Sequence, residues 1–275
     1  MGDPVAGNPT QYMLEKAFAA GDLDWRFLTF EVSAGDFEAA LHGVRIFGFR
    51  GVMLAPPHRG QVHRFLQTTS DAARLSGQVN CLQLVDGQLR GHNTESSALK
   101  KLIEGRTPLK DVKAVILGAG RLAKSFAAEL ALAGAAQIDL MCVEPPQAEP
   151  LIAALREEPK TAAVACRAIP WPQGAAMAID ADVRLLINAT PVGRSEKDAR
   201  LPIEIDQLPP QVTVVDATDH PTASRLIRDA SHRKLNAIDG LTLLVEQAAA
   251  AFEIWTGRKA DREAMRDAAE EFSAL

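Results

Sequence analysis

Residues 112–123, VKAVILGAGRLA, decide the fold of this chain. An apolar run rich in β-branched residues leads into Gly118, Gly120 and Ala123, spaced as G-x-G-x-x-A, and then into the apolar-periodic segment 126–132. A continuously apolar strand is typical of a parallel sheet that is covered on both faces. The turn is the dinucleotide-binding fingerprint, in which Gly118 permits a tight turn, Gly120 lets a pyrophosphate approach and Ala123 keeps helix and strand close. The alternative is a strand–helix turn that needs small residues only for packing.

The segment after this turn extends the prediction. The helix N-terminus offers free N–H groups and partial positive charge to phosphates. A second strand, expected over residues 138–143, ends at Glu144, about 20 residues beyond the turn, where an acid usually meets the adenosine ribose. The predicted cofactor contacts here are Gly118, Ala119, Gly120, Arg121, Leu122, Ala123 and Glu144.

Composition narrows the class of protein. The 275 residues are 47% hydrophobic, with a formal net charge of -5 and a pI of about 5.7. An acidic chain gives no electrostatic reason to expect nucleic acid. Cys81, Cys142 and Cys166 form no CxxC pair, so neither a disulfide framework nor a metal site is predicted. The N-terminus lacks a signal-peptide pattern, and no apolar run is long enough to span a membrane. We therefore expect a cytoplasmic protein, a monomer or homodimer, with a small-molecule substrate and no nucleic-acid or membrane partner.

Alternating strand and helix signals predict an α/β fold with a doubly wound parallel sheet. The dinucleotide domain is expected over residues 109–239, and a second α/β domain over residues 1–108 plus 240–275. Before the fingerprint, strands are predicted at 27–32, 51–54, 79–85 and 88–92, the last two as a hairpin around Asp86-Gly87, and helices at 35–47, 70–76 and 95–104, the last capped by Thr94. Beyond the second Rossmann strand, strands are predicted at 162–168, 183–187, 211–215 and 235–238, and helices at 147–157, 222–232, 241–255 and 261–272.

Several separated stretches together resemble the shikimate dehydrogenase family and span nearly the whole chain. They are residues 51–59 (GVMLAPPHR), 77–81 (GQVNC), 91–95 (GHNTE), 117–123 (LGAGRLA), 188–193 (NATPVG) and 239–257 (DGLTLLVEQAAAAFEIWTG), and residues 2–18 also align with the family's first motif. The resemblance implies an N-terminal substrate domain, a Rossmann domain and a C-terminal helix that returns to the substrate domain. It further implies NADP-linked interconversion of 3-dehydroshikimate and shikimate, or of a related cyclic hydroxy acid, in aromatic amino acid biosynthesis.

The resemblance also assigns roles to residues. The family's catalytic Lys–Asp pair corresponds here to Arg59 and Glu95, and the two serines that hold the substrate carboxylate correspond to Asn8 and Thr10. Arginine keeps its proton near neutral pH, so it is a poor proton donor, although it can polarise a carbonyl or grip a carboxylate. Retained substrate-side positions are Asn80 and Gln247, and the cofactor side extends to Asn188, Thr190, Pro191 and Gly240.

Other positions depart from the family in the same direction. Met53 and Ala55 replace an Asn and a Thr of the family, and Asp219 replaces a tyrosine. Glu144-Pro145-Pro146 stands where NADP-binding members carry an Asn-Arg-Thr that holds the 2′-phosphate. A carboxylate repels a phosphate and accepts hydrogen bonds from ribose hydroxyls, so NAD is favoured here, although NADP is the family's usual cofactor.

Simpler interpretations stand beside these assignments. Arg59 can be a solvated loop arginine, Glu95 can favour a helix dipole, and Gln247 can be a satisfied core amide. Asp216 is predicted to be a loop acid. Two functions remain open: an active oxidoreductase of shikimate dehydrogenase type, and a weak or inactive paralogue that binds a nucleotide or small acid in a regulatory role.

Overall fold

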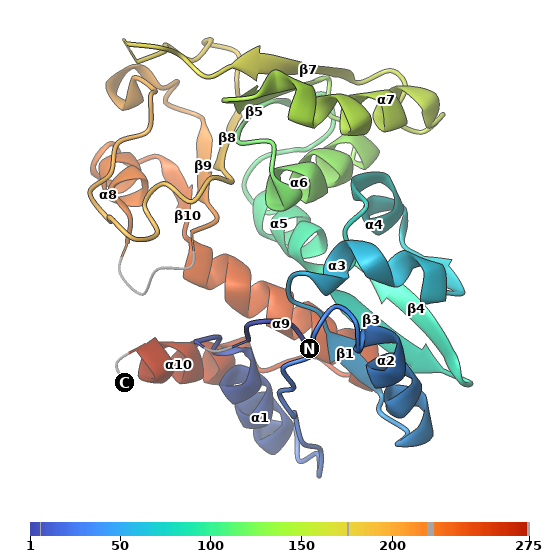
Figure 1. The fold of residues 1–275 in the computed structure, drawn as a ribbon. Helices are drawn as coiled ribbons and strands as arrows, with labels where there is room; N and C mark the ends of the chain where they lie inside the picture. The colour runs from blue at the N-terminus through green and yellow to red at the C-terminus, as the bar shows by residue number, and fades with distance from the viewer. Residues whose placement is uncertain (6, 175, 219–222, 274–275) are drawn as a thin grey trace. The chain divides into compact units, whose positions relative to one another are not determined.

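The computed structural model describes residues 1–5, 7–174, 176–218 and 223–273. The chain divides into two compact units, unit 1 (Met1–Ser97 and Val245–Leu275) and unit 2 (Ala98–Leu244) (Figure 1). Two helices cross from one unit into the other, α5 (Thr94–Glu104) and α9 (Gly240–Thr256). The predicted domain boundaries near residues 108 and 239 stay predictions.

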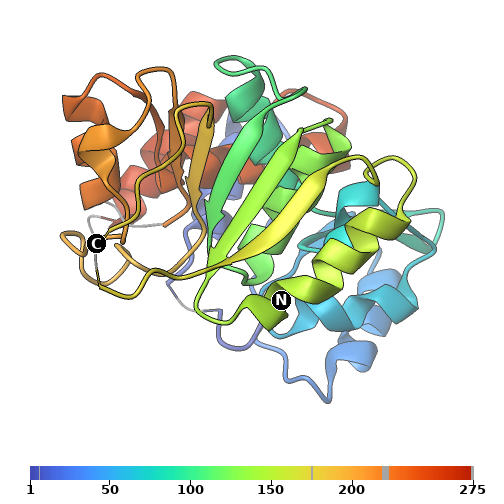
Figure 2. The ribbon, with the colours of Figure 1, turned by 90° about the horizontal axis from the view of Figure 1, so that it is seen from above.

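Unit 2 is built on a six-stranded parallel sheet in the order β10-β9-β8-β5-β6-β7. Figure 2 shows these strands side by side. Read from β7, the order is that of the doubly wound Rossmann fold, which changes direction between β5 and β8. The bounds are β5 (Lys113–Leu117), β6 (Gln137–Cys142), β7 (Ala165–Pro170), β8 (Leu185–Asn188), β9 (Thr213–Asp216) and β10 (Asn236–Ile238).

Helices cover this sheet. The Rossmann helix α6 (Arg121–Leu132) packs against β5 and β6, α7 (Glu149–Glu157) packs against β7, and α8 (Arg225–His232) packs against β9 and β10. Residues of β5, β8 and β9 are almost all buried. This burial confirms the prediction, made from their apolar runs, of a sheet covered on both faces. The short helices η2 (Pro145–Ala148) and η3 (Ile205–Gln207) complete the unit.

Unit 1 contains a four-stranded mixed sheet in the order β1-β3-β4-β2. Its strands are β1 (Gly51–Met53), β2 (Thr68–Thr69), β3 (Cys81–Val85) and β4 (Gln88–His92). The β3–β4 hairpin turns through Asp86 and Gly87, both at positive φ, which confirms the turn predicted from Asp-Gly. Its helices are α1 (Thr10–Ala20), α2 (Phe37–Ile46), α3 (His58–Gln61), η1 (Val62–Phe65), α4 (Asp71–Ser76) and α10 (Arg262–Ser273).

The two terminal helices of unit 1 lie side by side, α1 near the start of the chain and α10 at its end (Figure 1). Tyr12 of α1 donates a hydrogen bond of 2.9 Å to Glu271 of α10, and Lys16 lies 3.6 Å from the same carboxylate. The C-terminal helix α10 therefore packs on the N-terminal helix α1.

Two local predictions were wrong. Residues 27–32 form no strand, and only Glu31 makes a bridge, to Gly2, because no neighbouring strand offers a ladder to the rest of the segment. The cap of α5 is Asn93, whose side-chain oxygen accepts from Ser96 N at 3.0 Å, while Thr94 is already the first helical residue. Asp219 and the predicted helix start at Thr222 lie outside the described residues. None of the helices in the described ranges is both long and apolar enough to cross a membrane.

Candidate active site

Arg59 and Glu95 form an ion pair in unit 1. Arg59 Nη1 donates to Glu95 Oε1 at 2.8 Å, and Arg59 Nε donates to the carbonyl of Leu54 at 2.9 Å. The two side chains are only 17% and 11% exposed, so solvent screens the pair weakly. The structure thus brings together the two residues predicted from sequence, which excludes a freely solvated arginine.

The surrounding elements hold this pair in place. Arg59 lies on α3, just after Pro56 and Pro57, and the neighbouring His58 ring stacks on Phe37 at 4.2 Å between centroids. His58 Nε2 also lies 2.8 Å from the carbonyl of Val32. Because Arg59 has five N–H donors and two are used, three remain without a partner among the described residues. These donors can bind an oxygen of a ligand.

A network of buried side-chain amides holds the start of α5, the helix that carries Glu95. The Asn80 side chain donates from Nδ2 to Thr94 Oγ1 at 2.9 Å and accepts from Thr94 N at 2.7 Å. Asn93 donates to the carbonyl of Gln78 at 3.1 Å while it caps α5. Asn80 is therefore committed to fixing the start of α5, which makes it a positioning residue for Glu95 in addition to its predicted place on the substrate side.

The predicted carboxylate-binding residues bond to each other. The side-chain oxygen of Asn8 accepts from Thr10 N at 2.9 Å and from Thr10 Oγ1 at 2.5 Å. Thr10 is buried at the start of α1, and its hydroxyl proton is used inside this turn.

Gln247 is half-buried on α9, and its amide makes no hydrogen bond with any described residue. Gln247 is thus not a satisfied core amide.

In unit 2, the predicted cofactor residues gather at the carboxyl ends of adjacent strands. Leu117, the last residue of β5, is in register with Met141 of β6 on one side and with Asn188 of β8 on the other. Gly118 follows β5 directly, and Glu144 follows β6 after one intervening residue. In open α/β sheets the ligand crevice lies at these strand ends, where the strand order reverses.

The turn after β5 fits a pyrophosphate. Gly118 has a φ of 108°, and a Cβ there would lie 3.2 Å from the carbonyl oxygen of Ala189, so the position requires glycine. A Cβ on Gly120 would meet no atom within 4 Å, which leaves space beside the turn. Gly120 precedes α6 without a side-chain cap, and Arg121 opens a first turn that has no acidic residue. The exposed N–H groups and the positive charge suit a phosphate.

The Asn188–Gly193 loop is tied to β9. Asn188 Nδ2 donates to Val192 O and to Asp216 Oδ1, both at 3.0 Å, while its Oδ1 accepts from Thr190 N at 3.1 Å and from Thr190 Oγ1 at 2.6 Å. Asp216 is 1% exposed at the end of β9 and also accepts from Ser224 Oγ. The prediction of a loop acid at Asp216 was therefore wrong. An acid that ends an apolar strand, as in Val-Val-Asp, was the signal for a buried anchor.

The remaining cofactor-side residues have simple placements. Glu144 is exposed, and its Oε2 accepts from Gln147 Nε2 at 2.5 Å. Pro191 is exposed in the loop that Asn188 anchors, and Gly240 is the buried first residue of α9. Ala119 and Ala123 are buried, while Leu122 is half-buried.

Comparison with known proteins agrees with this geometry. Two family models match, the shikimate dehydrogenase substrate binding domain over residues 1–82 and the shikimate 5′-dehydrogenase C-terminal domain over residues 240–270. A shikimate dehydrogenase (NADP(+)) from Symbiobacterium thermophilum is 34% identical over 271 residues, which cover 98% of this chain and 92% of that protein. The chain belongs to the shikimate dehydrogenase family.

Two solved structures are similar to this chain over almost its full length. The ligand-free 5-ketofructose reductase of Gluconobacter sp. strain CHM43 has a TM-score of 0.93 and 32% identity, and the match covers 98% of this chain and 96% of that one. The shikimate 5-dehydrogenase of Listeria monocytogenes, in complex with shikimate and NAD, has a TM-score of 0.87 and 26% identity, with coverage of 97% and 93%. The chain is accordingly an NAD(P)-dependent oxidoreductase of shikimate dehydrogenase-like type.

Proposed function

We propose that this chain is an active dehydrogenase that interconverts a secondary alcohol and a ketone on a small polyhydroxylated substrate. The carrying observation is the Arg59–Glu95 ion pair, which keeps the charge signs of the family's Lys–Asp pair in a largely buried setting. The substrate class closest to the family is 3-dehydroshikimate and shikimate, or a related cyclic hydroxy acid.

The residues divide the chemistry between them. A bound nicotinamide cofactor supplies or takes up the hydride. Arg59 would donate a hydrogen bond to the ketone oxygen and stabilise the negative charge that develops there. Glu95 and the Leu54 carbonyl hold the guanidinium in a fixed orientation. Since a guanidinium does not release its proton near neutral pH, the proton that reaches the oxygen comes from water or from a substrate hydroxyl.

The cofactor would bind through unit 2. Gly118, Ala119, Gly120, Arg121, Leu122 and Ala123 would receive the pyrophosphate, Asn188, Thr190 and Pro191 would line the nicotinamide side together with Gly240, and Glu144 would accept from the ribose hydroxyls. Of the relatives described above, one is named as an NADP(+)-dependent shikimate dehydrogenase, and another was solved in complex with NAD. We propose a preference for NAD, because the exposed carboxylate of Glu144 would face the extra phosphate of NADP.

A neutral keto sugar is the second candidate substrate, and one observation favours it. The Asn8–Thr10 turn uses the Thr10 hydroxyl proton internally, so this pair offers a carboxylate fewer donors than two serines would. One solved relative with high structural similarity is a 5-ketofructose reductase. A ligand without a carboxylate would suit this altered substrate side.

Spectrophotometric assays at 340 nm would test both candidates. Shikimate and quinate are offered with NAD and with NADP, and 5-ketofructose with NADH and NADPH, each against wild type and Arg59→Ala. The proposal predicts turnover of at least one substrate, reduced by about 10²-fold or more in Arg59→Ala. Turnover of 5-ketofructose alone would select the keto sugar. No turnover together with measurable nucleotide binding would favour the regulatory paralogue and contradict the proposal.

A further inference from the structure

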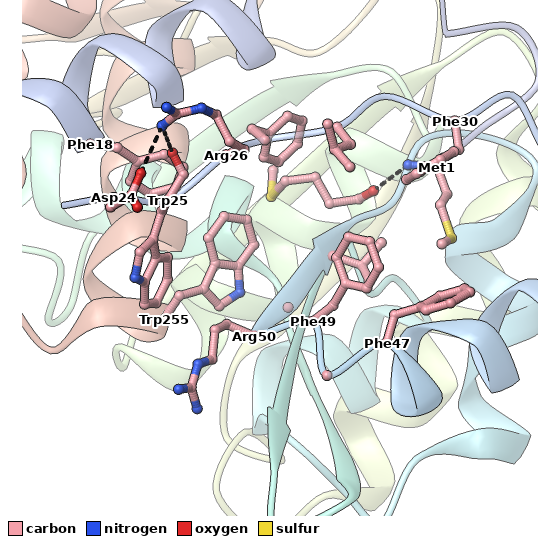
Figure 3. Close-up of a pocket in the computed structure, with 16 residues that line it drawn as sticks. Met1, Phe18, Asp24, Trp25, Arg26, Phe30, Phe47, Phe49, Arg50 and Trp255 are labelled. Carbon is pink, nitrogen blue, oxygen red and sulfur yellow. Dashed lines mark hydrogen bonds and ion pairs between the residues drawn. The ribbon is translucent and has the colours of Figure 1, made fainter.

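A cluster of buried hydrogen bonds links the start of α8 to the predicted cofactor side of unit 2. Asp216, the last residue of β9, lies at its centre. Its Oδ1 accepts from Asn188 Nδ2 and from Thr218 N, both at 3.0 Å, and its Oδ2 accepts from Ser224 Oγ. None of these residues lines the cavity of about 290 Å³ that unit 1 contains beside Trp255 (Figure 3). The cluster belongs to unit 2 alone.

Burial makes the partners of Asp216 necessary. Asn188, Thr218 and Ser224 are buried as well, so water cannot replace a hydrogen bond that is lost here. Ser224 also caps α8, because its Oγ accepts from Ile227 N at 3.3 Å. A carboxylate has acceptors only, which is what three converging donors require. Asp216 therefore joins β9, the cap of α8 and Asn188 in one cluster.

Asn188 connects Asp216 to the loop that follows it, residues 188–193. Its Nδ2 also donates to Val192 O at 3.0 Å, and its Oδ1 accepts from Thr190 N at 3.1 Å and from Thr190 Oγ1 at 2.6 Å. The Thr190 hydroxyl in turn accepts from Val192 N at 3.2 Å. The conformation of the loop thus depends on one side-chain amide, which Asp216 holds in place.

The same loop packs on the fingerprint turn. A Cβ on Gly118 would lie 3.2 Å from Ala189 O and 3.3 Å from Thr190 Cγ2, so only a glycine leaves room for the loop. At the other end of the loop, a Cβ on Gly193 would lie 3.4 Å from Ser224 Cβ. The loop is therefore held between the predicted pyrophosphate turn and the start of α8.

We propose that Asp216 is a positioning residue for the nicotinamide half of the cofactor. The inference rests on the cofactor site proposed above, in which Asn188, Thr190 and Pro191 line the nicotinamide side. Asp216 acts through Asn188 and holds the loop in the one conformation that seats the nicotinamide ring for hydride transfer. The adenosine half of the cofactor does not depend on this loop in that arrangement.

Hydrogen bonds within the loop show why its position matters. The Thr190 hydroxyl donates its proton to Asn188, and Pro191 has no N–H, so neither offers a donor to the carboxamide of nicotinamide. Contacts to the carboxamide are then left to backbone groups of the loop, whose positions no side-chain rotation can adjust. A displacement of about 1 Å between reacting groups can cost about 10²-fold in rate.

Calorimetric titration with NADH and with ADP-ribose, which lacks the nicotinamide, tests the proposal without any turnover. Asp216→Ala should bind NADH about tenfold more weakly than wild type, whereas its affinity for ADP-ribose should change by less than about twofold. Asp216→Asn keeps an oxygen that accepts from Asn188, so it should recover most of the affinity for NADH. An equal loss for both ligands, or no loss for NADH, would overturn the proposal.

Asp139→Ala is the matched control. Asp139 is also a buried carboxylate of the sheet, but it binds Arg167 in the middle of β6 and does not end a strand. Both alanine variants should be less stable than wild type in urea, and only Asp216→Ala should lose affinity for NADH selectively. The same ratio of the two affinities in both variants would mean that Asp216 has a structural role only.

Ser224→Ala is a milder variant that keeps the proposal testable if Asp216→Ala does not fold. It removes one of the three donors to Asp216 and leaves the carboxylate in place. The affinity for NADH should fall about threefold while that for ADP-ribose stays unchanged, and circular dichroism would verify the fold. Unchanged affinity for NADH would contradict the role of the cluster.

Kinetics separate this inference from the proposed function. With whichever substrate wild type turns over, Asp216→Ala should lower kcat by about tenfold or more and leave the KM of that substrate within about twofold. An unchanged kcat would overturn the positioning role. Nucleotide binding without turnover in wild type would contradict the proposed function alone, since the comparison of NADH with ADP-ribose would still decide this inference. A wild type that binds neither nucleotide would overturn both.

Discussion

A lysine cannot take both anchors that Arg59 uses. The guanidinium donates in two directions at once, from Nε to Leu54 and from Nη1 to Glu95, and still has donors left for a ligand. An ammonium is a compact point charge without a planar fork, so it would lose one of these fixed directions. The longer carboxylate of Glu95, compared with aspartate, lets the pair meet at 2.8 Å. Both departures from the family replace a side chain with a longer one of the same charge.

The replacement of lysine by arginine leads to a prediction about shikimate. We expect wild-type dehydrogenation of shikimate to be absent or very slow, because proton transfer by a lysine is worth about 10²–10⁴-fold in rate and Arg59 cannot provide it. The double variant Arg59→Lys with Glu95→Asp should raise any residual rate, whereas Arg59→Lys alone should not, since its reach no longer matches Glu95. Steady-state kinetics with NAD and NADP would measure this. Rapid turnover by wild type would show that a lysine is not needed.

The second prediction for a single residue concerns Glu144 and the choice between NAD and NADP. Its exposed carboxylate should make NAD bind more tightly than NADP by about tenfold, which corresponds to about 1–2 kcal/mol for like charges close together near a surface. Glu144→Ser should remove most of this difference and leave the affinity for NAD nearly unchanged. Calorimetric titration of both nucleotides provides the measurement, and Glu149→Ser, further along the same segment, is the control. Equal binding of NAD and NADP by wild type would mean that Glu144 points away from the ribose.

At the scale of elements, the candidate cofactor site depends on how three strands end. β6, β5 and β8 are adjacent and parallel, so their carboxyl ends bring Glu144, Gly118 and Asn188 to one edge of the sheet. Asp216 at the end of β9 then holds Asn188, which in turn holds Thr190. The loop is thus fixed by a chain of hydrogen bonds that starts in the buried sheet.

The two glycines of the fingerprint should respond differently to alanine. Gly118→Ala places a side chain at a φ of 108° and against Ala189, so it should lower the free energy of unfolding by about 1–3 kcal/mol. Gly120→Ala has an ordinary φ of -71° and meets nothing within 4 Å, so the protein should stay as stable as wild type. Its methyl group would instead fill the phosphate space and weaken nucleotide binding about tenfold or more. Urea unfolding and calorimetry separate the two effects, and equal nucleotide affinity in Gly120→Ala and wild type would contradict the predicted pyrophosphate position.

Long apolar strands were the most predictable part of the fold. The runs that become β5, β6, β8 and β9 are mostly apolar, with Asp139 and Thr213 as buried polar exceptions, and the structure places strands there within a few residues. The β3–β4 hairpin was predictable because Asp-Gly is one of the few pairs that accept positive φ at both turn positions. The Arg59–Glu95 pair was predictable because the loop motifs around both residues match the family.

Features that depend on distant partners were not predictable. Residues 27–32 have the composition of a strand, but a strand also needs a neighbour with free backbone groups, which composition does not reveal. The Leu54 carbonyl that holds Arg59 is a backbone atom, so no side-chain pattern marks it. Helix α1 was missed because its apolar positions are interrupted by polar residues and no side chain caps its start.

For the whole molecule, two titrating groups in unit 1 make stability depend on pH. Burial lowers the pKa of the Met1 ammonium to about 6, and burial together with the charge of Arg90 lowers the pKa of His92 below 6.5. In both cases the unfolded chain binds more protons than the folded chain over the affected pH range. The free energy of unfolding therefore rises with pH in that range.

The expected outcome is a protein that gains about 1–2 kcal/mol of unfolding free energy from Met1 between pH 6 and pH 8, after allowance for partial solvent screening of the amine. This contribution is complete above pH 8, the ordinary pKa of the amine, and is lost as the pH falls through about 6. His92 adds a further decrease below pH 6.5.

Urea unfolding at constant ionic strength from pH 5 to pH 8.5 would measure the profile. N-terminal acetylation removes the titrating amine, so it should flatten the profile between pH 6 and pH 8 and leave the decrease below pH 6.5, which His92→Gln should reduce. A wild-type profile that is already flat between pH 6 and pH 8 would show that the Met1 amine keeps its solvation in the folded protein.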